Sequence, residues 1–335
     1  MVKLLDVTLR DGGYTNSFDF QEDEAINIVK SLHESGVDYI EIGYRNGPEK
    51  GSSKLGISAR VDHNYIQAIR SNVPDAKLAV MLHPHNVSKE DLTELKDKGI
   101  SIIRVCVRAD KILESLKTIA QAKKLGLYVS ANFVRITYFE RSEARDCMLA
   151  AQSEGADLVY FADSNGHMVP SQVREYTEFL KGFLDIPLGF HAHNNLSLAL
   201  SNALVAIDSG IDIIDSSICG MGRGAGNLST ETFIAYLERS NVKHKYSLSN
   251  ILNIAEYVEQ NLLKNKSYAS TRDLTFGMAN FSSDFTMPIL EESLKQDVGW
   301  EKIVLDLYKS HPQKPNLKDI QNIASKIKSS QSFLM

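Results

Sequence analysis

Short apolar runs alternate with amphipathic stretches along about the first 240 residues of the chain. The apolar runs lie at 3–9, 37–43, 77–82, 101–107, 127–133, 158–162, 186–193 and 211–218. Their length and their Val and Ile content are typical of buried strands. The intervening stretches, such as 23–35 and 111–124, have helical spacing of apolar residues. Several of these helices end at a glycine just before the next strand, where glycine closes a helix well.

Eight strand–helix units of this kind predict an α/β fold, a (β/α)₈ TIM barrel, rather than an open doubly wound sheet. After residue 240 the pattern changes to helical stretches at 246–265, 288–295, 300–309 and 317–329, without a strong strand candidate. We therefore predict a TIM-barrel catalytic domain at 1–240 and a helical C-terminal region at 241–335. A lid, an oligomer contact and a partner surface are the roles left open for that region.

The composition narrows the class of protein. The 335 residues are 43% hydrophobic and 24% charged, as in an ordinary globular protein, and the net charge is −5. This charge gives no general attraction to nucleic acid or anionic membranes, and no apolar run is long enough to span a bilayer. Three cysteines form no disulfide framework or zinc motif, and no signal-peptide pattern begins the chain. We expect a cytoplasmic protein without nucleic-acid or membrane partners.

Candidate metal ligands follow three of the predicted strands. His191 and His193 are two residues apart, so in a strand their side chains project to the same side. Taken alone, such a pair also fits another interpretation, in which one histidine is a ligand or a core residue and the other is incidental. Asp11 follows the first strand and Asn227 lies in the loop after the eighth, and the loops at the carboxyl ends of barrel strands converge. Two imidazoles and two oxygens favour Mn²⁺ or Mg²⁺ over a closed zinc site.

These stretches resemble the signatures of the DRE-TIM metallolyase superfamily, most closely those of the 4-hydroxy-2-oxovalerate (4-hydroxy-2-oxoacid) aldolases. The matching segments are Thr-Leu-Arg-Asp-Gly at 8–12, His-Ala-His-Asn-Asn at 191–195 and the glycine-rich 220–227 followed by Glu231. The resemblance covers residues 1 to about 240 and is thinner beyond. It implies Mn²⁺ or Mg²⁺ held by Asp11, His191 and His193 and, in some branches, by Asn227. It also implies a chelating 2-oxoacid such as pyruvate, with Arg10 beside the developing enolate.

Further candidates surround this predicted site. The Arg10 guanidinium would add fixed positive charge and paired donors for an enolate or carboxylate. The alternative is a structural ion pair with Glu41, and both hold if Glu41 positions Arg10. Ser164, in a loop that matches the family's Asp-Ser-x-Gly, is a candidate for binding the substrate carboxylate, and an ordinary turn is its alternative. For His83 and His85 we expect helix-cap or loop roles rather than metal ligation.

The sequence departs from the aldolases at Tyr14, where the family has a histidine that acts as general base. A tyrosine, with an ordinary pKa of about 10, needs a strong downward shift to act as a base at neutral pH. The metal and Arg10 would supply part of it; alternatively Tyr14 packs over the barrel mouth and water moves the proton. Phe281 replaces a substrate-facing tyrosine. Both changes concern the aldehyde, so the family's aldehyde dehydrogenase partner is doubtful.

We therefore predict a divalent-metal-dependent aldolase or lyase that makes or breaks a carbon–carbon bond through the enolate of a 2-oxoacid. The aldehyde, the reaction direction, the metal and a homo-oligomeric state remain open. One alternative is a Claisen-type acyl-CoA/2-oxoacid synthase of the isopropylmalate synthase branch. Another, from a different class, is a non-catalytic barrel that keeps the metal as a scaffold.

Overall fold

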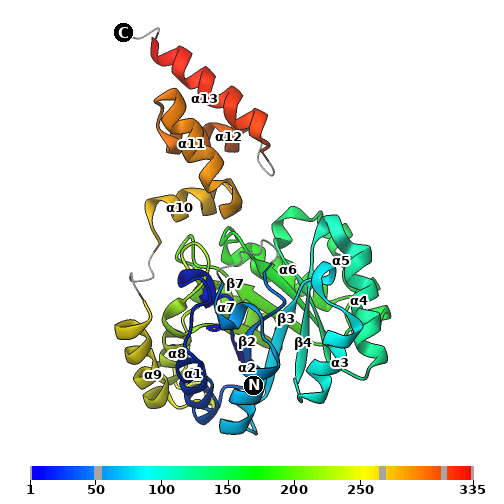
Figure 1. The fold of residues 1–335 in the computed structure, drawn as a ribbon. Helices are drawn as coiled ribbons and strands as arrows, with labels where there is room; N and C mark the ends of the chain where they lie inside the picture. The colour runs from blue at the N-terminus through cyan, green and yellow to red at the C-terminus, as the bar shows by residue number, and fades with distance from the viewer. Residues whose placement is uncertain (1, 49–54, 264–268, 311–314, 333–335) are drawn as a thin grey trace.

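The structure is a computed structural model that describes residues 2–48, 55–263, 269–310 and 315–332. Eight parallel strands follow one another in chain order around a closed barrel, with the first paired to the eighth. They are β1 (Lys3–Asp6), β2 (Tyr39–Arg45), β3 (Leu78–Leu82), β4 (Ile102–Val107), β5 (Val129–Phe133), β6 (Leu158–Asp163), β7 (Leu188–Ala192) and β8 (Ile213–Ser216). The predicted TIM barrel is confirmed (Figure 1).

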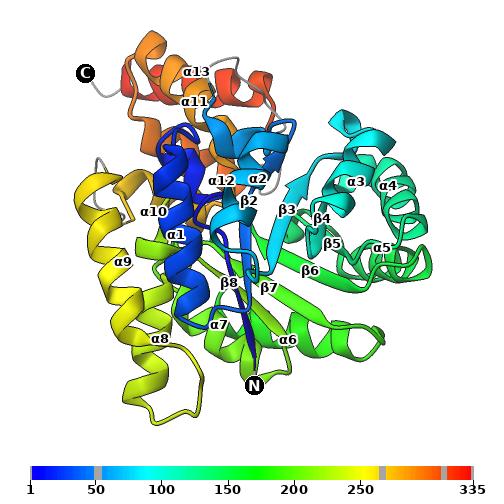
Figure 2. The same ribbon diagram turned by 60° about the horizontal axis from the view of Figure 1, so that its bottom comes forward.

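Eight helices surround the barrel: α1 (Glu22–Glu34), α2 (His63–Asn72), α3 (Lys89–Asp97), α4 (Ile112–Lys124), α5 (Arg141–Ser153), α6 (Pro170–Lys181), α7 (Ala199–Asp208) and α8 (Thr230–Arg239) (Figure 2). Helix α1 illustrates how they form. Its buried residues Ala25, Ile28, Val29 and Leu32 share one face. Acidic residues in its first turn stabilise the positive end of the helix dipole.

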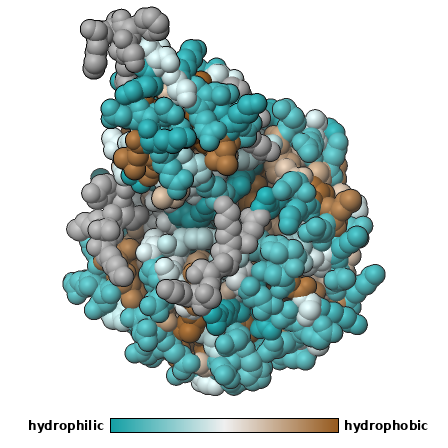
Figure 3. Space-filling view, turned by 45° about the horizontal axis from the view of Figure 1, so that its top comes forward, coloured by the Kyte–Doolittle hydropathy of each residue, from teal (hydrophilic) through white to brown (hydrophobic). Residues whose placement is uncertain are grey.

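The C-terminal helices divide between two hydrophobic clusters. Helix α9 (Leu248–Asn261) shares the barrel's outer core through Ile251, Ile254 and Val258. Helices α10 (Thr271–Met278), α11 (Thr286–Gln296), α12 (Trp300–Ser310) and α13 (Leu317–Ser332) enclose a second cluster and rise beyond one end of the barrel (Figure 1). In the space-filling view, hydrophilic residues dominate the visible face (Figure 3). Within the described ranges, no helix is long and apolar enough to cross a membrane.

The segment between α10 and α11 is docked onto the loops at the carboxyl ends of the strands. The Asn280 Oδ1 accepts hydrogen bonds from Thr137 Oγ1 at 2.8 Å and Asn165 Nδ2 at 2.9 Å. The Asp284 carboxylate pairs with Arg135 at 2.5 Å and with Arg223 at 3.5 Å. The helical region thus covers the barrel end at which active sites of this fold lie.

Candidate functional site

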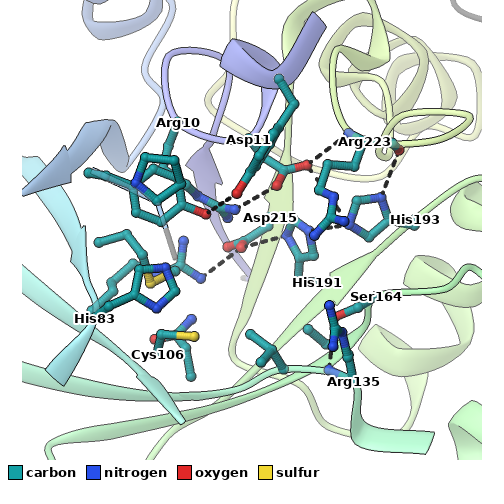
Figure 4. Close-up of a pocket in the computed structure, with 18 of the residues that line it drawn as sticks. Arg10, Asp11, His83, Cys106, Arg135, Ser164, His191, His193, Asp215 and Arg223 are labelled. Carbon is teal, nitrogen blue, oxygen red and sulfur yellow. Dashed lines mark hydrogen bonds and ion pairs between the residues drawn. The ribbon is translucent and has the colours of Figure 1, made fainter. Parts of the chain in front are cut away.

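A cavity of about 280 Å³ opens at the carboxyl ends of the strands. Six of the eight residues predicted for the site line it: Arg10, Asp11, Tyr14, Ser164, His191 and His193 (Figure 4). The other two lie behind this lining, where Glu41 is bonded to Arg10 and Asn227 to Asp11. The fold therefore brings all eight predicted residues into one region.

Asp11, His191 and His193 form the candidate metal centre. One ligand atom from each of the three lies within 4.8 Å of the other two, and all three side chains are buried. The two histidine Nε2 atoms are 3.2 Å apart, and His193 Nε2 is 3.8 Å from Asp11 Oδ2. His191 is in β7, whereas His193 follows that strand and forms an isolated bridge with Asn227. The predicted convergence of three segments is present.

Hydrogen bonds to the Nδ1 atoms set the tautomers of both histidines. His193 Nδ1 is 3.3 Å from the carbonyl oxygen of Arg223, which can only accept. His191 Nδ1 is 2.9 Å from a carboxylate oxygen of Asp215, whose pKa is lowered because Arg104 and His191 outweigh the effect of burial. Both Nδ1 atoms therefore donate, and both Nε2 atoms carry a lone pair. Two facing lone pairs with a nearby carboxylate fit a bound cation.

The fourth predicted ligand, Asn227, contacts the carboxylate of Asp11. Its Nδ2 donates to Asp11 Oδ2 at 3.0 Å and to Met221 O at 2.8 Å, whereas its buried Oδ1 has no hydrogen-bond partner. Gly222 closes over the pair, since a Cβ there would lie 2.4 Å from Asn227 Nδ2 and 2.8 Å from Asp11 Oδ2. A glycine is thus required where the loop after β8 passes the candidate ligands.

A continuous chain of buried ion pairs supports this centre from behind. Arg10 binds Asp11 through Nη1 and Glu41 through Nε, both at 2.7 Å. Arg104 then joins Glu41 at 2.9 Å to Asp215 at 2.7 Å. Three carboxylates against two guanidinium groups leave one net negative charge, which suits a cation. Arg104 and Asp215 were not predicted as site residues, and both lie inside predicted apolar strands.

The same ion pairs fix the ionisation of the site. Burial opposes ionisation of Asp11, but Arg10 and the two histidines outweigh burial and hold its pKa below the usual range. Burial, with smaller contributions from His191 and the arginines, lowers the pKa of His193 to about 4 despite the opposing charge of Asp11. An ionised carboxylate and neutral imidazoles are the forms that bind a metal.

Tyr14 does not have the lowered pKa that a base would need. Its ring packs edge-on against Phe18 at 4.9 Å, Arg223 lies over its face at 5.1 Å, and its hydroxyl is 3.4 Å from that of Tyr44. Burial raises its pKa, and this outweighs the lowering effect of Arg223. The Tyr14 phenol is therefore protonated at neutral pH in this environment and can donate a proton.

Ser164 follows β6 and lines the cavity. Its hydroxyl oxygen accepts a hydrogen bond from the backbone N–H of Arg135 at 2.9 Å. Arg135 has a left-handed backbone with φ of 53°, uncommon for a residue with a side chain, and its guanidinium pairs with Asp284. The oxygen of Ser164 is therefore held in place as an acceptor, and its hydroxyl proton can be donated to another group.

Comparison with known proteins extends these observations. The HMGL-like family profile matches residues 1–258. The chain is 32% identical over 306 residues to a 4-hydroxy-2-oxovalerate aldolase of Geobacillus genomosp. 3, covering 91% of each chain. It is 35% identical over 237 residues to an oxaloacetate decarboxylase of Mycobacterium tuberculosis, covering 70% of each.

One solved structure is similar to this chain in fold and in sequence. The N-terminal domain of a candidate aldolase from Bacteroides vulgatus has 29% identity and a TM-score of 0.78, covering 88% of this chain and 98% of that one. The predicted relationship to the DRE-TIM metallolyases is therefore confirmed, and the chain belongs to the HMGL-like family.

Proposed function

We propose that the protein is a divalent-metal-dependent aldolase that breaks or forms the C3–C4 bond of a 4-hydroxy-2-oxoacid, with pyruvate as one product or substrate. The predicted class of enzyme, a carbon–carbon lyase, agrees with the aldolase relative, which is aligned over 91% of this chain. The aldehyde is left open, because Tyr14 and Phe281 both differ from the pattern that the sequence resemblance implies.

The facing Nε2 lone pairs of His191 and His193, 3.2 Å apart and beside Asp11, carry this proposal. These three residues, with Asn227 as a fourth contributor, would hold Mn²⁺ or Mg²⁺. When bound, the ion supplies Lewis-acid stabilisation for the negative oxygen of an enolate. That chemistry suits a 2-oxoacid, in which the cleaved bond is one carbon removed from the carbonyl.

The chain's own residues complete the site. Arg10 uses Nε and Nη1 in its two ion pairs, so we assign Nη2 to a substrate oxygen. The Ser164 hydroxyl donates to the substrate carboxylate, because its oxygen already accepts from Arg135. The Tyr14 phenol donates to the 4-hydroxyl oxygen. The docked helical region acts as a cover that keeps water from the reacting groups.

A second candidate is decarboxylation of oxaloacetate, which the Mycobacterium tuberculosis relative favours. Loss of carbon dioxide from oxaloacetate gives the same enolate without removal of a hydroxyl proton. The two reactions therefore share Arg10 and the metal centre but differ in their need for a base. A single site can support both.

The test measures metal content, deuterium exchange at C3 of pyruvate and cleavage of 4-hydroxy-2-oxovalerate. We expect chelator-treated protein to lose both activities and to regain them with Mn²⁺ or Mg²⁺. His193→Ala should remain folded, bind less metal and catalyse neither reaction, whereas the control His33→Ala, in helix α1, should match the wild type. Normal metal content and exchange in His193→Ala would refute the assignment.

A further inference from the structure

His83 is a buried cavity-lining residue to which none of the proposed roles is assigned. It follows β3, only 6% of its surface is exposed, and its Nε2 is buried without a hydrogen-bond partner. Its ring stacks on that of Tyr44, with centroids 5.4 Å apart and planes 13° from parallel. Figure 4 shows the imidazole beside the cavity, across from the candidate metal centre. A held ring whose polar atom has no protein partner leaves that atom available to a ligand.

Cleavage of a 4-hydroxy-2-oxoacid requires a group that removes the hydroxyl proton, and the cavity offers few. His191, His193 and Asp11 are the candidate metal ligands. Asp215 is held by Arg104 and by the Nδ1 atom of His191, and Asp284 is held by Arg135 and Arg223.

The remaining titratable groups in the cavity hold protons of their own. Burial raises the pKa of the Tyr14 and Tyr44 hydroxyls and raises that of the Cys106 thiol to about 12. These three groups are therefore protonated at neutral pH. Among the described lining residues, His83 is left as the acceptor.

The surroundings of His83 keep its imidazole neutral. Burial is the main cause of a pKa lowered to about 4, and the nearby charges of His85, Arg10 and Lys111 lower it further. The stacked Tyr44 adds no charge, since its own hydroxyl stays protonated. A bound substrate carboxylate would bring negative charge into the cavity and move this pKa back towards the ordinary range. The acceptor is thus unprotonated before substrate binds and becomes more basic afterwards.

We propose that His83 is the general base of the carbon–carbon cleavage step, an assignment that rests on the proposed aldolase function. Its Nε2 takes the proton of the 4-hydroxyl group, the C4 carbonyl forms, and the C3–C4 electron pair passes to the enolate. The enolate then takes a proton from water at C3 to give pyruvate, and the imidazolium returns its proton to water. In the direction of bond formation, the imidazolium protonates the new alkoxide.

The experiment compares two reactions of the full-length protein loaded with Mn²⁺. Cleavage of 4-hydroxy-2-oxovalerate needs a base for the hydroxyl proton, whereas decarboxylation of oxaloacetate does not. We expect His83→Gln to slow cleavage by about 10²–10⁴-fold, the usual contribution of general acid–base catalysis, while decarboxylation stays near the wild-type rate. His63→Gln is the control, because His63 is exposed on helix α2 and does not line the cavity, and it should leave both rates unchanged.

A second variant tests the proton transfer itself. His83→Ala opens space beside Tyr44. Added imidazole should then restore cleavage, at a rate that rises with the concentration of neutral imidazole. Unchanged cleavage in His83→Gln would overturn the inference. An equal loss of cleavage and decarboxylation would also overturn it, since His83 would then only shape the cavity. If the wild-type protein catalyses neither reaction, the proposed function fails and this inference fails with it.

Discussion

Replacing Asp215 by asparagine should weaken metal binding while leaving the barrel folded. Asp215 is buried, and its Oδ2 accepts from His191 Nδ1 at 2.9 Å and from Arg104 Nη2 at 2.7 Å. Its Oδ1 has no hydrogen-bond partner, so an amide NH₂ can take that place and an amide oxygen can keep both bonds. The substitution therefore removes one negative charge and little else.

The size of the effect follows from the role of this carboxylate behind a ligand. A carboxylate that accepts from a metal-bound histidine typically contributes 10–100-fold in metal affinity, or about 1.4–2.7 kcal/mol. The bond to Arg104 changes from one between two charges to one with a neutral amide, which costs about 1 kcal/mol of folding stability. The loss of affinity should thus exceed the loss of stability, and unfolding should remain cooperative.

Calorimetric titration of Mn²⁺ into chelator-treated protein measures this directly. Asp212→Asn is a matched control, because Asp212 lies just before the same strand, is 42% exposed and pairs with Lys181 away from the cavity. We expect wild-type affinity in that control and weaker binding in Asp215→Asn. A dissociation constant for Asp215→Asn within the error of the wild-type value would show that the His191–Asp215 bond does not support a metal ligand.

Three further predictions concern Arg10, Tyr14 and Asp6. Arg10→Lys should keep its bound metal but lose about 10²-fold or more in turnover, because one ammonium cannot replace a planar fork; unchanged turnover would make Arg10 structural. Tyr14→Phe should slow cleavage of 4-hydroxy-2-oxovalerate but not decarboxylation of oxaloacetate. Wild-type rates of both reactions in this variant would leave the phenol without a role. Burial raises the pKa of Asp6 from 3.8 to about 7. The folded chain therefore keeps a proton that the unfolded chain loses, and stability falls as pH rises from about 4 to 7. Unfolding of Asp6→Asn should vary less across that window, and an unchanged slope would contradict the assignment.

The barrel was predictable because its strands are buried on both faces and its helices on one. Runs such as 158–162 are wholly apolar, and their regular alternation with amphipathic stretches leaves few folds to choose from. The grouping of the candidate metal ligands was predictable for a related reason. The carboxyl ends of barrel strands converge, so His191 and Asp11 are neighbours in space once the fold is known.

Arg104 and Asp215 escaped prediction because each stands within an apolar run, where the surrounding pattern indicates a strand and hides the exception. A charged residue inside a buried strand is itself a signal, since such residues are rarely buried without a partner. The partner cannot be read from one strand. Glu41 on β2, Arg104 on β4 and Asp215 on β8 meet only in the closed barrel. The surroundings of Tyr14 could not be predicted for a similar reason, since Phe18 and Tyr44 meet its ring only in the folded chain.

The buried ion pairs link the orientation of the site to the closure of the barrel. Buried charges are costly to desolvate, and apolar residues of similar volume often stabilise a fold as well or better. Here the chain of contacts runs from Asp11 through Arg10, Glu41 and Arg104 to Asp215, and ends on His191. Both ends are candidate ligands of one metal. We therefore infer that this series of buried contacts serves to orient Asp11, His191 and Arg10 together. A shift in any of these strands would disturb all three side chains.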